Sequence, residues 1–259
     1  PACRKPAGGG APGGATFPGA PVVLVSIDTL RSDRLPAYGW TKVKTPHLDR
    51  LAAESYLFEK AFAPTPMTFP SHTSMLTGTL PPEHGVRNNS GFVFRGERHA
   101  SLPRALKERG YATGAAVSAY VLRRETGLGA LFDWYEDSVP TNPDVATVRY
   151  QRPGAVTLGF AKEWLSANAG RPFFLFFHVF EPHRPYEPAE RFLAEYGATY
   201  EAEIATADAV VGELFEHLKA LGVWEKAVVV VTSDHGEGLG EHGEEQHSLL
   251  LYREALQVP

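Results

Sequence analysis

The sequence predicts an α/β fold in which a largely parallel central sheet carries helices on both faces. Four short apolar runs, bounded by turn or polar residues, are typical of buried strands and cover residues 22–27, 112–117, 173–177 and 228–232. Runs that are apolar throughout favour a sheet that is covered on both sides. Helical patterns lie between these runs, and strands that alternate with helices favour a parallel sheet.

Three segments between the strands have the apolar spacing of amphipathic helices. The first begins at Pro46, after a Thr45 that is suited to the N-cap position, and ends at Phe58. The other two cover residues 155–167 and 200–221. Because each of these segments lies between predicted strands, we expect the helices to cover the faces of the sheet.

The composition is that of a globular protein. Of 259 residues, 43% are hydrophobic and 21% are charged, which supplies enough apolar material for a large core. The formal net charge is -5 at pH 7 and Lys and Arg do not form runs, so we expect no nucleic-acid partner. No stretch reaches the ~18 to 20 consecutive apolar residues that a membrane span requires.

Residues 1–20 are rich in Gly, Pro and Ala, which predicts a flexible leader. They contain the only cysteine, Cys3, so no internal disulfide is expected. A cysteine before such a tether resembles the mature end of a bacterial lipoprotein and predicts an extracytoplasmic location, periplasmic or cell-surface, with a lipid on Cys3. The alternative is a stray cysteine in a disordered tail. We expect the folded domain to comprise residues 21–259 and, because its last residues carry no cap or polar tail, to lack its C-terminal part.

Polar residues follow the first and the last predicted strand. Asp28 and Thr29 come directly after the first strand, and Asp234 and His235 come shortly after the last one. In parallel sheets, ligands gather at the carboxyl ends of the strands, so these side chains are candidates for one site. Aspartate and histidine are ligands that suit zinc and manganese. The alternative for such aspartates is a helix cap or a turn residue.

Residues 64–78 form a hydroxyl-rich turn that runs into a short helix, with Thr68 in the turn. The free N–H groups and the dipole of a helix N-terminus favour anions. A hydroxyl at that place can bind a metal, ionise and attack a tetrahedral phosphorus or sulfur centre. The alternative for Thr68 is a plain N-cap.

With these motifs, residues 21–259 resemble the sulfatase family of the alkaline phosphatase-like superfamily. Seven pieces match in the family's order, and together they are far more specific than any one alone. They are Asp28 with the Leu-Arg-Ser-Asp after Thr29, Thr-Pro-His-Leu-Asp-Arg-Leu-Ala at 45–52, the Thr68 segment with its Leu-Thr-Gly, His-Gly-Val at 84–86, Glu-Pro-His-Arg-Pro-Tyr at 181–186, Ser-Asp-His-Gly-Glu at 233–237, and the closing Leu-Tyr-Arg-Glu-Ala-Leu-Gln-Val-Pro. The resemblance implies an alkaline phosphatase-like α/β catalytic domain.

The resemblance also implies a role for individual residues. The implied metal ligands are Asp28, Thr68, Asp234 and His235, with Thr68 also in the place of the nucleophile. Asn89 falls where related hydrolases place an amide that contacts a non-bridging substrate oxygen.

Four histidines are further candidates. His183, in the Glu-Pro-His motif, matches a substrate-contacting or proton-donating histidine, and a structural surface histidine is its alternative. His72 stands in the place of an arginine that helps to position the nucleophile, and it is a candidate substrate contact. His242 and His247 follow the metal motif in a Gly- and Glu-rich loop. His242 is a candidate substrate contact. For both His242 and His247, however, a solvated side chain is the expectation that fits such a loop best.

Two departures from the family pattern change the expected chemistry. Sulfatases carry Cys or Ser at the nucleophile, which is oxidised to the aldehyde formylglycine, whereas Thr68 would give a ketone. Thr29 stands where calcium-type sulfatases have a second Asp. A site with fewer carboxylates and one histidine favours Zn or Mn over Ca. We expect one divalent metal ion, and a second site is left open.

Both departures resemble the threonine-nucleophile branch of the superfamily. This branch implies hydrolysis of phosphodiesters or phosphonates, or phosphotransfer, in preference to hydrolysis of sulfate esters. The expected substrate is a small-molecule, lipid or glycan ester, and the expected contact with a membrane is only through the lipid on Cys3. The alternative function is a catalytically inactive module that keeps the fold for binding or scaffolding.

Overall fold

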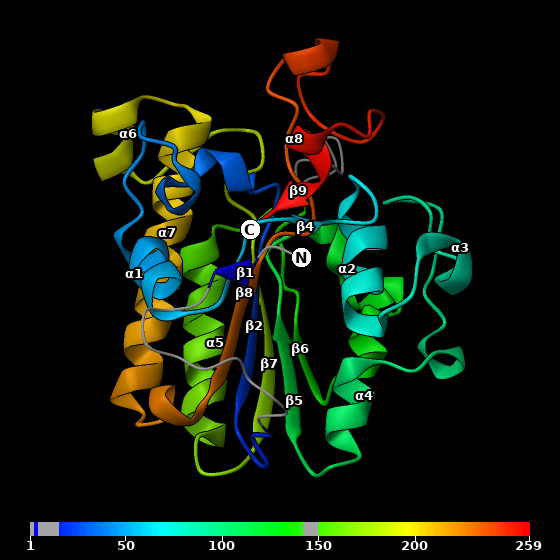
Figure 1. Cartoon of the computed structure of the whole chain (residues 1–259). Coiled ribbons are helices and arrows are strands. Elements are labelled where there is room, and N and C mark those ends of the chain that lie inside the picture. The colour runs from blue at the N-terminus through cyan, green and yellow to red at the C-terminus, as the bar shows by residue number, and fades with distance from the viewer. Residues whose placement is uncertain (1–2, 5–15, 142–149) are drawn as a thin grey trace.

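The computed structural model describes residues 3–4, 16–141 and 150–259, and its centre is a five-stranded sheet (Figure 1). The strands lie in the order β6-β5-β7-β2-β8 and every neighbouring pair is parallel. Their bounds are β2 Val22–Ile27, β5 Ala112–Ala116, β6 Trp134–Glu136, β7 Phe173–Val179 and β8 Val228–Thr232. All carboxyl ends therefore lie at one edge of the sheet, which is at the top of Figure 1.

Helices cover both faces of this sheet, as the sequence predicts. Figure 1 shows α1 (Pro46–Glu54), α5 (Gly154–Asn168) and α7 (Tyr200–Ala220) on one side. It shows α2 (Thr68–Thr77) and α4 (Leu102–Lys107) on the other. The predicted fold class, an α/β protein with a largely parallel sheet, is confirmed.

The core has two halves because side chains alternate between the faces of a strand. Val23, Val25 and Ile27 of β2 pack in the half under α1, α5 and α7. Leu24 of the same strand packs in the half under α2, together with Phe174 and Phe176 of β7. Residues of even number in these two strands therefore face α2, and this alternation positions the site described below.

Three details differ from the sequence-based predictions. The short strand β6 was not predicted. Helix α1 ends at Glu54, and Leu57–Phe58 instead form strand β3, which pairs with β1 (Cys3–Arg4). Strand β8 is only partly buried, with Val230 44% exposed, and it lies at the edge of the sheet, where it pairs only with β2 among the described residues.

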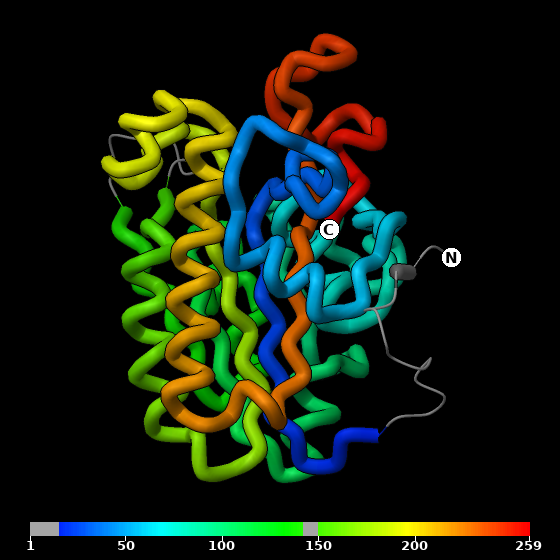
Figure 2. Tube along the Cα trace, turned by 60° about the vertical axis from the view of Figure 1, so that its left-hand side comes forward, coloured from blue at the N-terminus to red at the C-terminus, as the bar shows by residue number. Residues whose placement is uncertain are grey.

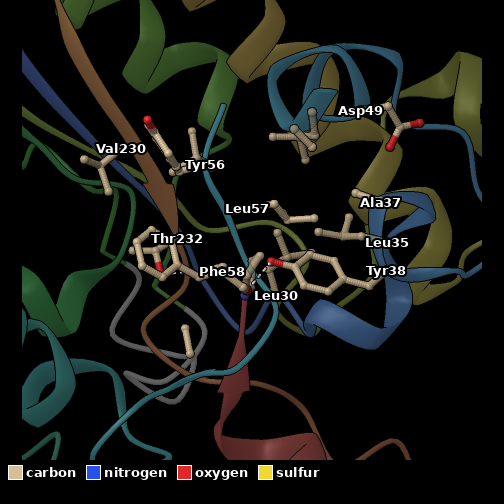
Figure 3. A pocket seen from close by; sticks show the side chains of 15 residues that line it. Leu30, Leu35, Ala37, Tyr38, Asp49, Tyr56, Leu57, Phe58, Val230 and Thr232 are labelled. Carbon is tan, nitrogen blue, oxygen red and sulfur yellow. Dashed lines mark hydrogen bonds between the residues drawn. The ribbon is translucent and has the colours of Figure 1, made fainter. Parts of the chain in front are cut away.

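A hollow lined mainly by apolar side chains lies beside β8, between this strand, β3 and α1 (Figure 3). The hydroxyl of Tyr38 donates a hydrogen bond of 3.1 Å to the carbonyl oxygen of Phe58 at this hollow. Asp28, Thr68, Asp234 and His235 are not among the residues that line it. The hollow is therefore separate from the predicted site.

The remaining elements are short. The helices are α3 Pro81–His84, α6 Glu190–Tyr196 and α8 Arg253–Leu256, and strand β4 (Ala61–Phe62) pairs with β9 (Gln257–Val258). The 3-10 helices cover Ser32–Arg34, Pro36–Tyr38, Gly96–Arg98, Tyr120–Leu122, Arg124–Thr126, Leu128–Leu131, Trp224–Lys226 and Glu241–Gly243. Figures 1 and 2 both place α8 and β9 above the carboxyl edge of the sheet.

Most of the predicted leader lies outside the described residues, so its flexibility stays a prediction. Within the described part of the chain, no helix is both long and apolar enough to cross a bilayer.

Candidate active site

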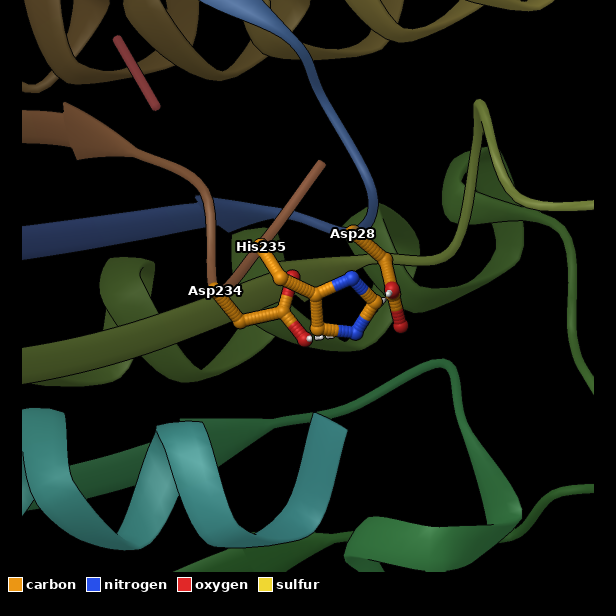
Figure 4. Close-up of side chains that lie close together, drawn as sticks. All are labelled: Asp28, Asp234 and His235. Carbon is orange, nitrogen blue, oxygen red and sulfur yellow. Dashed lines mark ion pairs between the residues drawn. The ribbon is translucent and has the colours of Figure 1, made fainter. Parts of the chain in front are cut away.

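Four side chains converge at the carboxyl edge of the sheet because β2 lies beside β8. Asp28 follows β2, Asp234 and His235 follow β8, and Thr68 is the first residue of α2. The Nε2 atom of His235 lies 3.2 Å from Asp234 Oδ2, 3.3 Å from Thr68 Oγ1 and 3.9 Å from Asp28 Oδ1. Figure 4 shows both carboxylates and the imidazole close to one another. The structure thus brings together all four residues predicted as metal ligands.

This cluster fits a divalent cation. The ligand atoms of Asp28, Asp234 and His235 all lie within 4.8 Å of one another, and the three residues are fully buried. The backbone N–H of Thr29 donates to Asp234 Oδ1, whereas Asp234 Oδ2 and Asp28 Oδ1 have no hydrogen-bond partner in the part of the chain that the structure describes. A buried carboxylate oxygen without a partner is costly, and a metal ion would remove that cost.

The electrostatics of the cluster also fit a bound divalent cation. Burial raises the pKa of Asp28 well above its ordinary value, and the nearby charges of Asp234 and Glu237 raise it further. Burial also raises the pKa of Asp234. Burial lowers the pKa of His235 well below its usual value, which keeps the ring neutral. Its Nδ1–H donates to the carbonyl oxygen of Gly236 at 2.9 Å, so the lone pair of Nε2 faces the cluster.

His178 is a site residue that the sequence reasoning missed. It is the next-to-last residue of β7, fully buried, and lies opposite Ser26 of β2. The backbone N–H of Ser118 donates to its Nδ1 at 3.2 Å, so the proton resides on Nε2. Nε2 then donates to Asp28 Oδ2 at 3.2 Å and leaves Oδ1 for a metal. The available signal was a single polar residue in an otherwise apolar strand.

His72 is buried behind the nucleophile position. Its Nδ1–H donates to the carbonyl oxygen of Thr68 at 2.7 Å, and its Nε2 accepts from the hydroxyl of Ser26 at 2.8 Å. Both ring nitrogens are thus occupied, so the placement does not fit the predicted contact with substrate. His72 instead ties the first turn of α2 to β2, and the hydroxyl of Ser71 adds a 2.5 Å bond to the carbonyl oxygen of Asp234.

Asn89 lies beside the N-terminus of α2, as its predicted role requires. Its Oδ1 accepts a hydrogen bond of 2.8 Å from the backbone N–H of Phe69, the residue after Thr68. The amide side chain is only partly buried. The structure therefore places a partly exposed amide side chain against the backbone of the residue that follows Thr68.

The three remaining histidines have different surroundings. His183, in the loop after β7, lies with its ring 5.0 Å from that of His247, and burial lowers its pKa to about 4. His242 has a side chain that is 48% exposed, and its ring stacks on Tyr252, so the structure does not bring it to the cluster. The expectation of a solvated loop histidine is wrong for His247, because the loop folds back and leaves its side chain 6% exposed.

A model of the family described as Sulfatase matches residues 21–259, which is most of the chain. The chain belongs to the sulfatase family. This membership confirms the resemblance drawn from the seven motifs.

Curated relatives include enzymes named for sulfur and for phosphorus chemistry. An ulvan-active sulfatase of Formosa agariphila is 28% identical over 266 residues, which cover 85% of this chain and 51% of the relative. A bis(5'-adenosyl)-triphosphatase, ENPP4, of Bos taurus is 27% identical over 222 residues, which cover 83% of this chain and 47% of the relative. The chain thus spans about half the length of these relatives.

Solved structures show that the fold is shared. The crystal structure of yidJ from Bacteroides fragilis superposes with a TM-score of 0.79 at 23% identity, covering 96% of this chain and 69% of that one. The phosphonate monoester hydrolase of Agrobacterium radiobacter gives a TM-score of 0.71 at 20% identity, covering 93% and 67%. The sulfatase-family fold is therefore present across the described residues.

Proposed function

We propose that this sulfatase-family chain is a metal-dependent hydrolase or transferase of phosphate-type esters, with Thr68 as its nucleophile. The observation that carries the proposal is the position of Thr68 Oγ1, at a helix N-terminus and 3.3 Å from His235 Nε2. The same His235 Nε2 lies near two buried carboxylate oxygens that have no hydrogen-bond partner among the described residues. A hydroxyl in this setting would be activated by a bound metal, and the positive end of the helix dipole would favour an anion beside it.

The residues that would hold the metal are Asp28, Asp234, His235 and Thr68. Two carboxylates, one imidazole and one hydroxyl form a donor set that suits Zn or Mn better than Ca. Such an ion, when bound, favours the ionised form of a hydroxyl and offsets negative charge on the transferring group. The chain's own contribution is to orient these ligands, through His178 at Asp28 and through Thr29 at Asp234.

The proposed reaction has two steps. In the first, the hydroxyl of Thr68 loses its proton and Oγ1 forms a bond to phosphorus. The bond from phosphorus to the leaving oxygen breaks, and that oxygen takes up a proton. In the second, the oxygen of water or of an acceptor alcohol attacks phosphorus, and the bond to Thr68 breaks. The proton lost by the attacking water or alcohol restores the threonine hydroxyl. We propose that the side-chain amide of Asn89, beside the N-terminus of α2, contacts a non-bridging oxygen in both steps.

Phosphorus is favoured over sulfur because threonine cannot supply the aldehyde that sulfatases use. The relatives named for phosphorus chemistry, a triphosphatase and a phosphonate monoester hydrolase, support this direction. The proposed substrates are phosphodiesters or phosphonates of small molecules, lipids or glycans. An extracytoplasmic location with a lipid on Cys3 is proposed from the composition of residues 1–20.

A substrate panel tests the proposal. Metal-loaded protein is assayed on bis(4-nitrophenyl) phosphate, 4-nitrophenyl phenylphosphonate and 4-nitrophenyl sulfate, beside Thr68→Ala and the surface control His217→Gln. We expect turnover of the phosphorus esters in the wild type and in the control, and a loss of about 10³-fold or more in Thr68→Ala. Turnover of the sulfate ester alone would overturn the preference for phosphorus. Metal binding without any turnover would favour the inactive binding module.

A further inference from the structure

The turn between β2 and the 3-10 helix Ser32–Arg34 contains a strained backbone conformation. Thr29 has a φ of 56°, which lies in the left-handed region. A β-branched residue rarely adopts this region, so its surroundings must impose the conformation. The threonine side chain gives no local help, because Thr29 Oγ1 is buried and has no hydrogen-bond partner among the described residues. Other groups of the fold must therefore hold Thr29 in place.

This turn directs two backbone N–H groups to the segment that follows β8. The N–H of Thr29 donates to Asp234 Oδ1 at 3.3 Å, and the N–H of Leu30 donates to the hydroxyl oxygen of Ser233 at 2.9 Å. Asp28 directly precedes Thr29 in the same turn. One short turn thus supports both carboxylates of the proposed metal site, Asp28 as a member of the turn and Asp234 through the bond from Thr29.

Tyr200, the first residue of α7, bonds the turn on both sides of Leu30. Its hydroxyl donates to the carbonyl oxygen of Thr29 at 2.6 Å and accepts from the backbone N–H of Arg31 at 3.0 Å. Tyr200 is 3% exposed. Burial raises the pKa of Tyr200 well above its ordinary value, so the phenol keeps the proton that it donates. A single buried hydroxyl therefore ties the strained turn to α7.

We propose that Tyr200 is a positioning residue of the metal site, and that its hydroxyl holds Thr29 in the left-handed conformation from which the N–H of Thr29 reaches Asp234. This inference rests on the metal site of the proposed function. Without the hydroxyl, Thr29 is free to relax toward the negative φ that β-branched residues adopt. The bond from Thr29 to Asp234 is then lost, and the two carboxylates of Asp28 and Asp234 no longer share one support.

The zinc affinity of Tyr200→Phe, measured by titration against a competing chelator, tests the proposal. This variant removes only the hydroxyl, and we expect the dissociation constant for Zn to rise about tenfold, as for other groups that orient metal ligands. The matched control is Tyr38→Phe. The hydroxyl of Tyr38 also donates to a backbone carbonyl oxygen, that of Phe58, but it does so at the hollow beside β8. The control should bind Zn as the wild type does.

Rescue through the backbone separates positioning from a general loss of structure. Glycine adopts a positive φ without strain, so adding Thr29→Gly to Tyr200→Phe should restore the zinc affinity to within about threefold of the wild type. Adding Thr29→Val instead keeps a β-branched residue at this φ, so it should restore nothing.

Three results would overturn the role of Tyr200. The first is a wild-type dissociation constant in folded Tyr200→Phe, and the second is a raised constant that Thr29→Gly does not correct. If Tyr200→Phe does not fold, the double variant with Thr29→Gly should fold and bind Zn, and its failure to do so is the third. Failure of the proposed function itself would be seen separately, as zinc binding by the wild type together with full activity in Thr68→Ala.

Discussion

At the level of single residues, the site depends on histidines held in defined tautomers. Ser118 donates to His178, His72 donates to the carbonyl oxygen of Thr68, and His235 donates to that of Gly236. Burial lowers the pKa of each of these imidazoles, so they act as neutral rings. A neutral imidazole with one nitrogen occupied offers one defined donor or acceptor at the other.

The first prediction concerns His178. Replacing it in His178→Leu removes the hydrogen bond to Asp28 Oδ2 and frees that carboxylate to turn. We expect the dissociation constant for Zn to rise about 10- to 100-fold, the usual effect of losing such a partner of a metal ligand. Titration against a competing chelator measures it, with His217→Gln as the surface control. An unchanged dissociation constant in correctly folded His178→Leu would show that His178 does not orient Asp28 for the metal.

A second prediction concerns the pH dependence of stability at Glu203. This residue of α7 is 2% exposed, and its Oε2 has no hydrogen-bond partner within residues 3–4, 16–141 and 150–259. Burial, and next the charge of Glu181, raise the pKa of Glu203 to about 8. Between its ordinary value of 4.5 and about 8, the folded chain keeps a proton that the unfolded chain has lost. The free energy of unfolding should therefore fall as pH rises through this window, by up to about 1.4 kcal/mol per pH unit.

Glu203→Gln should flatten this dependence, because the amide carries no titrating proton. Urea unfolding at several pH values measures it, and the exposed Glu225→Gln serves as the control. The same pH slope in Glu203→Gln as in the wild type would show that another group is responsible.

Much of the site could be predicted from residue types alone. Asp28, Asp234 and His235 follow apolar strands, and strands of a parallel sheet end at one edge, so their meeting was predictable. His178 lies inside an apolar run. Its role could not be predicted, because the role depends on which strand lies beside β7. His247 was misjudged because the fold of a Gly- and Glu-rich loop depends on close backbone approaches, such as that of Gly238, which composition does not reveal.

At the level of elements, the register of β2 against β7 builds the site. Ser26 pairs with His178, and both residues are of even number and face α2. Ser26 and the following even residue, Asp28, thereby meet His72 and His178. The strands themselves were predictable from their apolar runs. The edge position of β8 was not, because four consecutive valines look alike in a central strand and in an edge strand.

A third prediction concerns the contact between the metal motif and the closing segment. The backbone N–H groups of Gly236 and Glu237 donate to the carbonyl oxygens of Ala255 and Glu254 at 2.9 Å and 3.1 Å. A Cβ at Gly236 would lie 1.8 Å from the carbonyl oxygen of Glu254, so Gly236→Ala must push the two segments apart. We expect a loss of about 1 to 3 kcal/mol in unfolding free energy and weaker metal binding.

The matched control is Gly159→Ala in α5. A Cβ at Gly159 meets nothing within 4 Å and the position is exposed, so alanine should stabilise the helix by about 0.5 to 1 kcal/mol. Denaturant unfolding of both variants gives the comparison. A Gly236→Ala protein as stable as the wild type would contradict the tight contact.

At the level of the whole molecule, the sheet has an apolar core on each face and a polar cluster at its carboxyl edge. Most of the largest buried side chains lie in the sheet and in the helices packed on it. The carboxyl edge instead buries three carboxyl groups and an imidazole, those of Asp28, Asp234, Glu237 and His235. Their burial and mutual repulsion disfavour the charged carboxylates, so we expect a bound cation to stabilise the folded state. The hollow beside β8 in Figure 3 lies apart from this edge.

A fourth prediction follows for thermal stability. A metal ion that binds only the folded chain stabilises it by RT ln(1 + [L]/Kd), about 2.7 kcal/mol at a hundredfold excess over Kd. Added Zn or Mn should raise Tm by several degrees, and EDTA should reverse the change. Asp234→Ala should abolish the response, whereas His217→Gln should keep it. A rise in Tm that persists in Asp234→Ala would place the metal elsewhere.

The central claim is that Thr68 attacks phosphorus and carries the transferred group. Mass spectrometry of the peptide that contains Thr68, after acid quenching of the metal-loaded protein during turnover of 4-nitrophenyl phenylphosphonate, tests it most directly. The account predicts a phosphorus adduct on Thr68 that is absent from Thr68→Ala and from Asp234→Ala. Turnover that persists in Thr68→Ala, with no adduct on the wild-type peptide, would contradict it.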